Sequence, residues 1–270
     1  MQKPGQLSIG DLGAELKRAG GGVTVKSQAE IDLMLDAGRI VGLTLRKLRG
    51  IVAPGMKTKE LDVVAEREIR ALGGKPAFKG YRGFPASICI SVNDQIVHGI
   101  PGEKVIKAGD LVSLDLGAIV GGFHGDSAVT VEVGEVPDEL RRLLETGEAS
   151  LWAGIAKVRT GNRIGDISHA IEEEILRRGK YGIVREYVGH GIGRALHEDP
   201  QVPNFGPAGR GLLLRPGMAL AIEPMVNLGG DATRVLKDDW TVVTADGKPS
   251  VHFEHTCIVT DGEPIITTKV

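Results

Sequence analysis

An internal repeat constrains the fold of this chain more than any other feature of its sequence. Residues 55–74 align without gaps with residues 161–180, and the alignment pairs Gly55 with Gly161 at the start of each segment. Both segments have the apolar spacing of an amphipathic helix. Three shorter matches follow in the same order: HGI at 98–100 and 190–192, a β-type run with an acid at Asp115 and at Glu223, and a second such run with an acid at Asp126 and at Glu254. A common order of matches is the signature of a duplicated unit.

The duplication predicts an α/β fold made of two similar halves. We place the halves at about 25–136 and 137–270, in a single catalytic domain of residues 25–270 that follows an N-terminal extension of residues 1–24. The halves are expected to pack about a pseudo-two-fold axis around one shared, curved and largely antiparallel sheet.

Residues 111–131 have the pattern of a β-hairpin in which each strand carries a carboxylate. Two β-rich runs flank a Gly-Gly pair at 121–122, which is the signal of a two-residue turn. With that turn, Asp115 lies opposite Ala128, and Asp115 and Asp126 point to the same face as diagonal neighbours. Two like charges this close repel each other unless a cation lies between them. For the hairpin alone, the solvated face of an edge hairpin is the preferred interpretation, and a metal site needs further ligands elsewhere in the chain.

The repeat supplies those ligands. Pseudo-two-fold symmetry brings four acids together on one axis with a histidine on each side: Asp115, Asp126, Glu223 and Glu254, flanked by His98 and His190. Four carboxylates in one apolar cleft need cations to offset the cost of their desolvation. Carboxylate-rich ligation with one or two imidazoles suits Mn, Fe, Co or Zn, and a pair of such ions is a known hydrolytic arrangement. The sequence therefore predicts a hydrolase with two divalent metal ions.

Other signals lie outside this group of acids. Ser27 and Glu30 form a capping box ahead of apolar residues at helical spacing, and Thr58 is placed to cap the next helix. Arg82 lies in a basic loop and is interpreted as solvated. Strand alternation points His255 away from the acids, so we expect a structural role for it.

The composition excludes several other classes of protein. The formal net charge of −2 over 270 residues argues against a broad nucleic-acid-binding surface. Cys89 and Cys257 are too few for a disulfide framework, so a reducing cytoplasm is the simplest setting. No apolar run approaches the ~20 residues of a membrane span, and the N-terminal residues lack the apolar core of a secretory signal. We expect a cytoplasmic protein that needs neither a membrane nor a nucleic acid.

Seven blocks of sequence carry a resemblance to a known family. They read FPASICISVNDQIVHGIP, LVSLDLGAIVGGFHGDSAVTV, YVGHGIG, LHEDPQVPNFG, GMALAIEPMVN, DDWTVVTADG and HFEHTCIVT. In this order they resemble the type I methionine aminopeptidases of bacteria, over nearly all of the chain after Val25. The resemblance implies the pita-bread fold of two related α/β halves. It also implies a monomeric hydrolase that removes the N-terminal methionine of nascent polypeptides, favours a small second residue, holds two divalent ions (Co, Mn, Fe or Zn) and associates transiently with the ribosome.

The resemblance also implies a role for each residue of the site. The metal ligands would be Asp115, Asp126, His190, Glu223 and Glu254, with Asp126 and Glu254 bridging the two ions. His98 would contact the peptide instead of binding metal, although the symmetry of the repeat suggested a ligand. His197 would stabilise the tetrahedral intermediate, and Glu223 would carry a proton from the attacking water to the leaving amine. The methionine side chain would lie in a pocket formed by Tyr81, Phe84, Cys89, His98, Leu196 and Trp240.

Two other classes of protein remain open at this point. A proline-specific peptidase of the same fold would share the ligands, but such enzymes usually carry a further N-terminal domain for which 270 residues leave no room. A non-enzymatic domain of this fold that binds peptides would lose metal ligands, whereas all the expected positions are occupied here. Release of methionine from Met-Ala-Ser, with Ala-Pro-Ala left intact, would separate the three.

Overall fold

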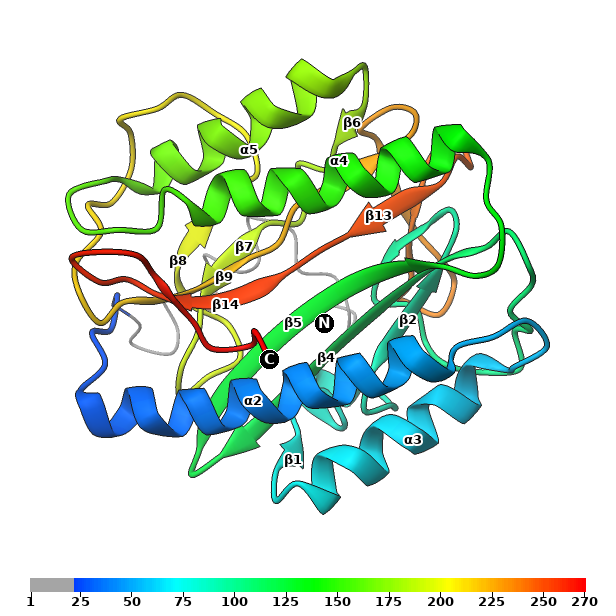
Figure 1. The fold of residues 1–270 in the computed structure, drawn as a ribbon, viewed down its shortest axis with the longest axis horizontal. Coiled ribbons are helices and arrows are strands. Elements are labelled where there is room, and N and C mark those ends of the chain that lie inside the picture. The colour runs from blue at the N-terminus through cyan, green and yellow to red at the C-terminus, as the bar shows by residue number, and fades with distance from the viewer. Residues whose placement is uncertain (1–21) are drawn as a thin grey trace.

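Two pairs of helices flank a curved set of antiparallel strands in the computed structural model, which describes residues 22–270. The first pair is α2 (Gln28–Ile51) and α3 (Thr58–Ala71), and the second is α4 (Asp138–Ile155) and α5 (Ile164–Arg178). Figure 1 shows the two pairs along opposite margins of the molecule, with the strands between them. This mixed architecture confirms the predicted α/β fold class.

The strands assemble into antiparallel sheets, in two of which a pair of strands recurs. Their bounds are β1 (Lys75–Pro76), β2 (Cys89–Val92), β3 (Gln95–Val97), β4 (Leu111–Val120), β5 (Phe123–Glu132), β6 (Gly182–Ile183), β7 (Gly189–Gly191), β8 (Glu198–Val202), β9 (Ala219–Ile222), β10 (Met225–Asn227), β11 (Thr233–Val235), β12 (Val242–Thr244), β13 (Ser250–His252), β14 (His255–Ile258) and β15 (Ile265–Ile266). One sheet contains the order β2-β4-β5 and another contains β7-β9-β14. The antiparallel pair β4-β5 carries Asp115 and Asp126, and the antiparallel pair β9-β14 adjoins Glu223 and Glu254, as expected for a duplicated unit.

The repeated segments also have the same local structure. Gly55 and Gly161 have φ angles of 93° and 90°, a left-handed conformation that glycine adopts without strain. Lys57 and Arg163, which the alignment pairs, are the N-caps of α3 and α5, and each forms an isolated β-bridge. The backbone N–H of Lys57 donates to the carboxylate of Glu60 at 2.6 Å, and that of Arg163 donates to the carboxylate of Asp166 at 2.7 Å. The division of the chain at residue 136 stays a prediction, and most of the expected extension at 1–24 lies outside the described residues.

The two helices of the first pair begin differently. In α2, Ser27 accepts a hydrogen bond from the N–H of Glu30 at 3.4 Å and donates its own N–H to the Glu30 carboxylate at 2.9 Å, as predicted. In α3 the N-cap is Lys57, and Thr58 is the first helical residue. The hydroxyl of Thr58 donates to the carbonyl of Gly102 at 3.2 Å. The prediction that Thr58 caps the helix was wrong by one residue, because a contact with a distant segment occupies its hydroxyl.

The hairpin of β4 and β5 has the predicted register. Both turn glycines have positive φ angles, of 55° and 84°, as a two-residue hairpin turn requires. Asp115 lies opposite Ala128 and Asp126 lies opposite Gly117. The alternate side chains, such as Leu114, pack in the apolar core beneath α2 and α3. The two carboxylates therefore share the face that points away from these helices.

A seam between β5 and the start of β14 joins the two sheets. Ala128 and Glu254 exchange backbone hydrogen bonds at 2.9 and 3.4 Å. Thr256 accepts from the N–H of Asp126 at 3.1 Å and donates its hydroxyl to the Asp126 carbonyl at 2.8 Å. The seam brings Asp126 and Glu254 together, although 128 positions separate them in the sequence.

No helix within residues 22–270 has the length and apolarity that a membrane crossing needs.

Candidate active site

A cavity at this seam has a wall of acids, histidines and aromatic rings. It is lined by Phe78, Tyr81, Arg82, Phe84, Cys89, Val97, His98, Asp115, Asp126, Glu186, Tyr187, Val188, His190, Leu196, His197, Glu223, Trp240, His252 and Glu254. Every residue that the sequence placed in the site belongs to this wall. The fold therefore brings all of them together from both halves of the chain.

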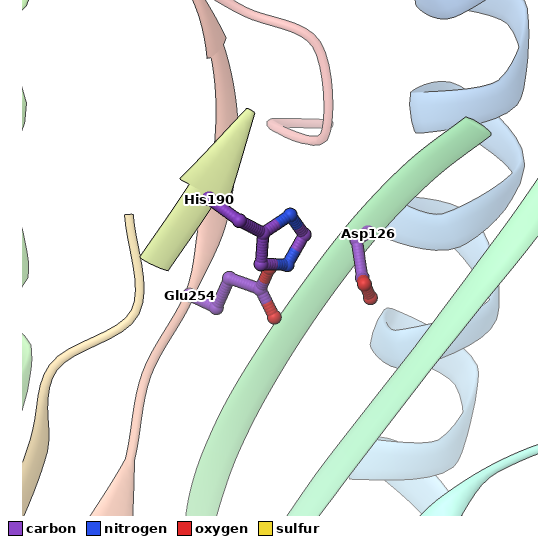
Figure 2. Close-up of side chains that lie close together, drawn as sticks. All are labelled: Asp126, His190 and Glu254. Atoms are coloured by element: carbon purple, nitrogen blue, oxygen red, sulfur yellow. The ribbon is translucent and has the colours of Figure 1, made fainter. Parts of the chain in front are cut away.

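Asp126, His190 and Glu254 form a group of possible metal ligands in the described part of the chain. Figure 2 shows their side chains converging from β5, from β7 and from the residue before β14. Each offers one donor atom, and these atoms all lie within 4.8 Å of one another. All three side chains are buried, and one carboxylate oxygen of Asp126 and one of Glu254 have no hydrogen-bond partner within residues 22–270. Unpaired, buried carboxylate oxygens around one point suit a divalent cation, so these residues fit such an ion.

Asp115 and Glu223 add two carboxylates to this group. Asp115 is buried in β4, and Glu223 follows β9 with its Oε1 atom 3.4 Å from Nε2 of His190. Burial raises the pKa of both carboxyl groups well above their ordinary values, and the nearby charge of Asp126 raises them further. Burial also raises the pKa of Asp126 to about 7. Buried carboxylates that repel one another in this way are stabilised in their charged form when a cation binds between them.

Hydrogen bonds determine which nitrogen of two cavity histidines faces the acids. Nδ1 of His190 lies 2.8 Å from the carbonyl oxygen of Gly191. A carbonyl only accepts, so Nδ1 carries the proton and Nε2 keeps a lone pair for a metal. Nδ1 of His197 lies 2.8 Å from the Tyr81 hydroxyl, whose pKa burial and the charge of Asp126 raise to about 12. We assign that hydroxyl as the donor, which leaves Nε2 of His197 as a donor into the cavity.

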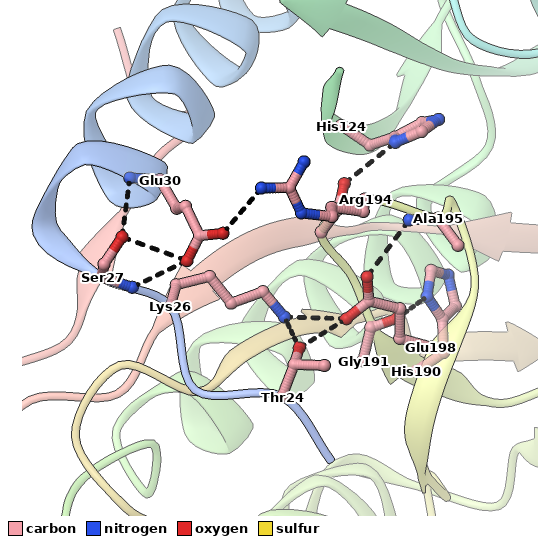
Figure 3. Close-up of polar contacts among 11 residues, drawn as sticks. Thr24, Lys26, Ser27, Glu30, His124, His190, Gly191, Arg194, Ala195 and Glu198 are labelled. Atoms are coloured by element: carbon pink, nitrogen blue, oxygen red, sulfur yellow. Dashed lines mark hydrogen bonds and ion pairs between the residues drawn. The ribbon is translucent and has the colours of Figure 1, made fainter. Parts of the chain in front are cut away.

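The loop that carries Leu196 and His197 is held by the N-terminal segment, as Figure 3 shows. Thr24 Oγ1 and Lys26 Nζ both donate to Oε2 of Glu198, at 2.7 and 2.8 Å. The other oxygen of Glu198 accepts from the backbone N–H three residues earlier, at 3.1 Å. The carboxylate of Glu198 thus closes the loop on itself and ties it to the segment before α2.

Further contacts hold the start of this loop. The carbonyl of Gly193 accepts from the backbone N–H of His124 at 2.8 Å and lies 2.9 Å from its Nδ1. A Cβ atom at Gly193 would stand 2.5 Å from Cε of Lys26, so a larger residue here would displace that side chain. Arg194 reaches Glu30 of α2 at 3.0 Å on the surface. The cavity loop is therefore anchored on both sides, by β5 and by the start of α2.

Beside the acids, the cavity wall becomes apolar. Its members there are Phe78, Tyr81, Phe84, Cys89, Leu196 and Trp240. Phe84 meets Trp240 edge-on, with ring centroids 5.0 Å apart. His98 has a φ angle of 60°, directly after β3, and its ring lies 6.4 Å from that of Trp240. Cys89 pairs with Asp115 across β2 and β4. The apolar pocket and the acids are thus parts of one continuous site.

The structure adds cavity residues that sequence reasoning missed. Arg82, interpreted as solvated, lines the cavity, and its guanidinium lies 5.4 Å from the centroid of the Tyr81 ring. Tyr187 lines it too, and no pattern in the sequence marked it. His252 also lies in the wall. Its position two residues before Glu254 was the one signal that could have placed it on the same face.

Both the sequence and the fold of this chain are similar to those of known proteins. Residues 32–261 match metallopeptidase family M24. Methionine aminopeptidase 1 of Bacillus subtilis (strain 168) is 50% identical over 248 residues, which span 92% of this chain and 100% of that protein. The crystal structure of methionine aminopeptidase from Thermotoga maritima superposes with a TM-score of 0.90 at 43% identity, covering 92% of this chain and 100% of that one. Prolidase from Pyrococcus furiosus has a TM-score of 0.74 at 23% identity, with 91% of this chain and only 65% of the prolidase covered, and it shares the fold alone.

Proposed function

Because the chain belongs to metallopeptidase family M24 and matches methionine aminopeptidases over their whole length, we propose how its residues carry out the metal-dependent removal of N-terminal methionine. This hydrolysis is the activity of the chain as a methionyl aminopeptidase. One observation supports the assignment of residues most strongly. The cavity joins a group of buried carboxylates and His190 to an apolar pocket within a single wall.

Five side chains would hold the metal: Asp115, Asp126, His190, Glu223 and Glu254. The charge of four carboxylates is balanced by two dications, so we propose two ions, with Asp126 and Glu254 shared between them. Carboxylates with one imidazole suit Mn, Fe, Co or Zn. Bound ions would supply a water of lowered pKa and polarise the scissile carbonyl.

The protein's own groups would move the proton and stabilise the developing charge. Glu223 would take a proton from the attacking water and pass it to the amine as the peptide bond breaks. His197 would donate a hydrogen bond to the carbonyl oxygen as it becomes negative, and His98 would contact the peptide near the scissile bond. Burial lowers the pKa of His98 to about 4 and that of His197 well below its ordinary value. Both rings are therefore neutral donors at pH 7.

The pocket would select the side chain that is removed. Aromatic rings and a thiol suit an unbranched thioether, which is flexible and polarisable. The pocket residues would be Tyr81, Phe84, Cys89, His98, Leu196 and Trp240. The free α-amino group of the substrate would lie on the Asp115 side, which restricts the enzyme to N-terminal residues. We propose that a small second residue is favoured.

Peptide hydrolysis tests this proposal directly. The metal-free protein is supplied with Mn²⁺, Co²⁺ or Fe²⁺ and offered Met-Ala-Ser, with Ala-Pro-Ala as the control. We expect free methionine from the first peptide and no product from the second. Cleavage of Ala-Pro-Ala would overturn the methionine pocket, and absence of cleavage with any metal in a folded sample would favour a peptide-binding role. A panel of methionyl peptides that differ in their second residue then measures how many second residues the enzyme accepts. Metal analysis measures the number of ions bound per chain.

In the cell, we propose that the substrates are nascent polypeptides that still carry their initiator methionine. The protein would act as a cytoplasmic monomer that associates transiently with ribosomes. Size-exclusion chromatography with light scattering tests the monomer. Co-sedimentation with ribosomes that carry a nascent chain, compared with empty ribosomes, tests the association.

A further inference from the structure

His252 is a buried cavity residue to which the proposed mechanism assigns no task. It ends β13, its side chain is 2% exposed, and it lines the cavity together with Glu223. Neither of its ring nitrogens has a hydrogen-bond partner among the residues that the structure describes. A neutral imidazole has one donor and one acceptor, so both are unpaired here. Buried polar groups without partners are rare in proteins, so each one calls for a physical explanation.

The charged neighbour of His252 is Glu223. Nε2 of His252 lies 3.5 Å from Oε2 of Glu223, and Nε2 of His190 lies 3.4 Å from the other oxygen, Oε1. The carboxylate is therefore bracketed by two imidazoles, with one oxygen facing each. Nδ1–H of His190 donates to the carbonyl of Gly191, so Nε2 of His190 presents a lone pair on the side of Glu223. His252 has no such constraint and is free to present an N–H.

We propose that His252 is a positioning residue that keeps the two tasks of Glu223 on separate oxygens; the inference rests on the proposed function. Nε2–H of His252 donates to Oε2, so Oε1, which faces His190, would be the oxygen left to hold a metal. Oε2 retains a second lone pair to accept the proton of the attacking water. The 3.5 Å separation is slightly longer than a formed hydrogen bond, and catalytic contacts commonly tighten only when ligands bind. Without the donor, both oxygens can turn to the metal and the proton acceptor is lost.

The structure favours this role over direct ligation by His252. The possible metal ligands within 4.8 Å of one another, in the part of the chain that is described, are Asp126, His190 and Glu254. His252 stands outside this group, as Glu223 does, but it faces Oε2 of Glu223, whereas His190 of the group faces Oε1. It is therefore placed to orient a ligand instead of being one.

Three variants of His252 test the proposal. His252→Leu removes the donor, His252→Gln keeps an N–H donor at similar reach, and His252→Asn keeps a donor that is too short to reach Glu223. The wild-type protein is first assayed for methionine release, because failure there would overturn the proposed function and not this inference. We expect kcat of the Leu and Asn variants to fall about 10- to 100-fold, with KM within about 2-fold, and the Gln variant to stay within about 3-fold of the wild type.

A second readout does not depend on activity. Each metal-free variant is titrated with Co²⁺ and followed by visible absorption. The Leu variant should bind Co²⁺ at least as tightly as the wild type but with a changed spectrum, because a second carboxylate oxygen enters the coordination shell. The control is His255→Leu, which removes a ring whose Nδ1 contacts Thr268 Oγ1 at 2.8 Å, away from the cavity. Its kcat and Co²⁺ spectrum should match the wild type.

The outcomes separate clearly. A kcat equal to wild type in the Leu variant would overturn the proposal, and so would a Gln variant as slow as the Leu variant. A loss of Co²⁺ affinity of 10-fold or more in the Leu variant would overturn it as well, since it would make His252 a ligand. If the Leu variant does not fold, the comparison of Gln with Asn still decides the question.

Discussion

Replacing Lys26 with methionine removes the cation that ties the N-terminal segment to the loop carrying His197. Lys26 Nζ lies 2.8 Å from Oε2 of Glu198, and the two side chains are 4% and 12% exposed. Methionine keeps much of the unbranched stem of lysine, so the substitution tests the charge more than the packing. We expect both stability and catalysis to fall.

The size of the stability loss depends on the hydrogen bonds that Glu198 retains in the variant. Removing one partner of a fully buried ion pair costs about 3–5 kcal/mol, because the other charge is left buried. Glu198 retains Thr24 Oγ1 at 2.7 Å and a backbone N–H at 3.1 Å. The loss is therefore closer to the about 1.5–3 kcal/mol of one hydrogen bond to a charged group. In a chain of this size about 1 kcal/mol lowers Tm by about 2–4 °C, so we expect a fall of roughly 3–12 °C.

The loss of folding stability in Lys26→Met also depends on pH. Burial raises the pKa of the Glu198 carboxyl, but the hydrogen bonds from Lys26 and Thr24 outweigh burial, and the pKa lies below its ordinary value of 4.5. A carboxyl whose pKa is lower in the folded state stabilises that state above its unfolded pKa, and this contribution is lost as pH falls through the folded pKa. The stability difference between the wild type and Lys26→Met should be largest above pH 4.5 and shrink in more acidic solution.

A double-mutant cycle measures the effect by chemical denaturation of Lys26→Met, Glu198→Gln and the double variant. The double variant has no unpaired buried charge, so we expect a coupling energy of about 1–2 kcal/mol. Since His197 lies in the anchored loop, kcat/KM for a methionyl peptide should fall about 10-fold in Lys26→Met. Arg194→Met is the control, because Arg194 is 70% exposed in its pair with Glu30. Its guanidinium also lies 4.5 Å from the centroid of the Phe123 ring, so stability should change by less than about 1 kcal/mol.

Two results would refute this reasoning. One is additivity of the Lys26 and Glu198 effects within about 0.5 kcal/mol, which would mean that the pair is not coupled. The other is an unchanged kcat/KM in a Lys26→Met sample that has lost the expected stability, which would mean that the loop keeps its geometry without the ion pair.

Three further predictions concern metal binding, packing and the pocket. Asp126→Asn should abolish methionine release and the rise in Tm on adding Mn²⁺ together, and a variant that still hydrolyses Met-Ala-Ser would contradict a shared ligand. Gly38→Ala puts a Cβ atom 2.5 Å from the Thr267 carbonyl oxygen. It should lower the free energy of unfolding, measured by urea denaturation, by about 1–3 kcal/mol. Gly50→Ala, in the same helix, meets no atom within 4 Å and should be neutral or stabilising by up to about 1 kcal/mol; equal losses would contradict the packing argument. Trp240→Ala should lower kcat/KM for methionyl peptides about 10-fold, mainly through KM, and an unchanged KM would remove Trp240 from the pocket.

Much of the candidate site could be predicted from sequence because its strands obey local rules. A two-glycine turn determines the register of the hairpin that it closes, and strand alternation then assigns each side chain to a face. Asp115 and Asp126 line the cavity for this reason. The repeat extended the argument to Glu223 and Glu254, because a duplicated unit places equivalent residues about a common axis. The roles assigned to these residues stay predictions until they are measured.

Other features could not be predicted, because they depend on contacts between segments that are distant in the sequence. Thr58 looked like a helix cap, but its hydroxyl bonds the carbonyl of Gly102. Arg82 looked solvated, but it lies over the Tyr81 ring in the cavity wall. The connection of Lys26 to Glu198 spans 172 positions and leaves no pattern in either segment.

The sequence by itself determined that six cavity residues share one site, since turn type, strand alternation and the repeat decide the face on which each lies; they are Asp115, Asp126, Glu223, Glu254, His98 and His190. Only the tertiary structure decided which atoms meet there. It placed Glu223 between His190 and His252, with one oxygen toward each ring, and it paired Nδ1 of His190 with a carbonyl. The reason is physical. Contacts across the seam depend on the separation and angle of two packed sheets, and a shift of about 1 Å there exchanges hydrogen-bond partners while every local pattern stays the same.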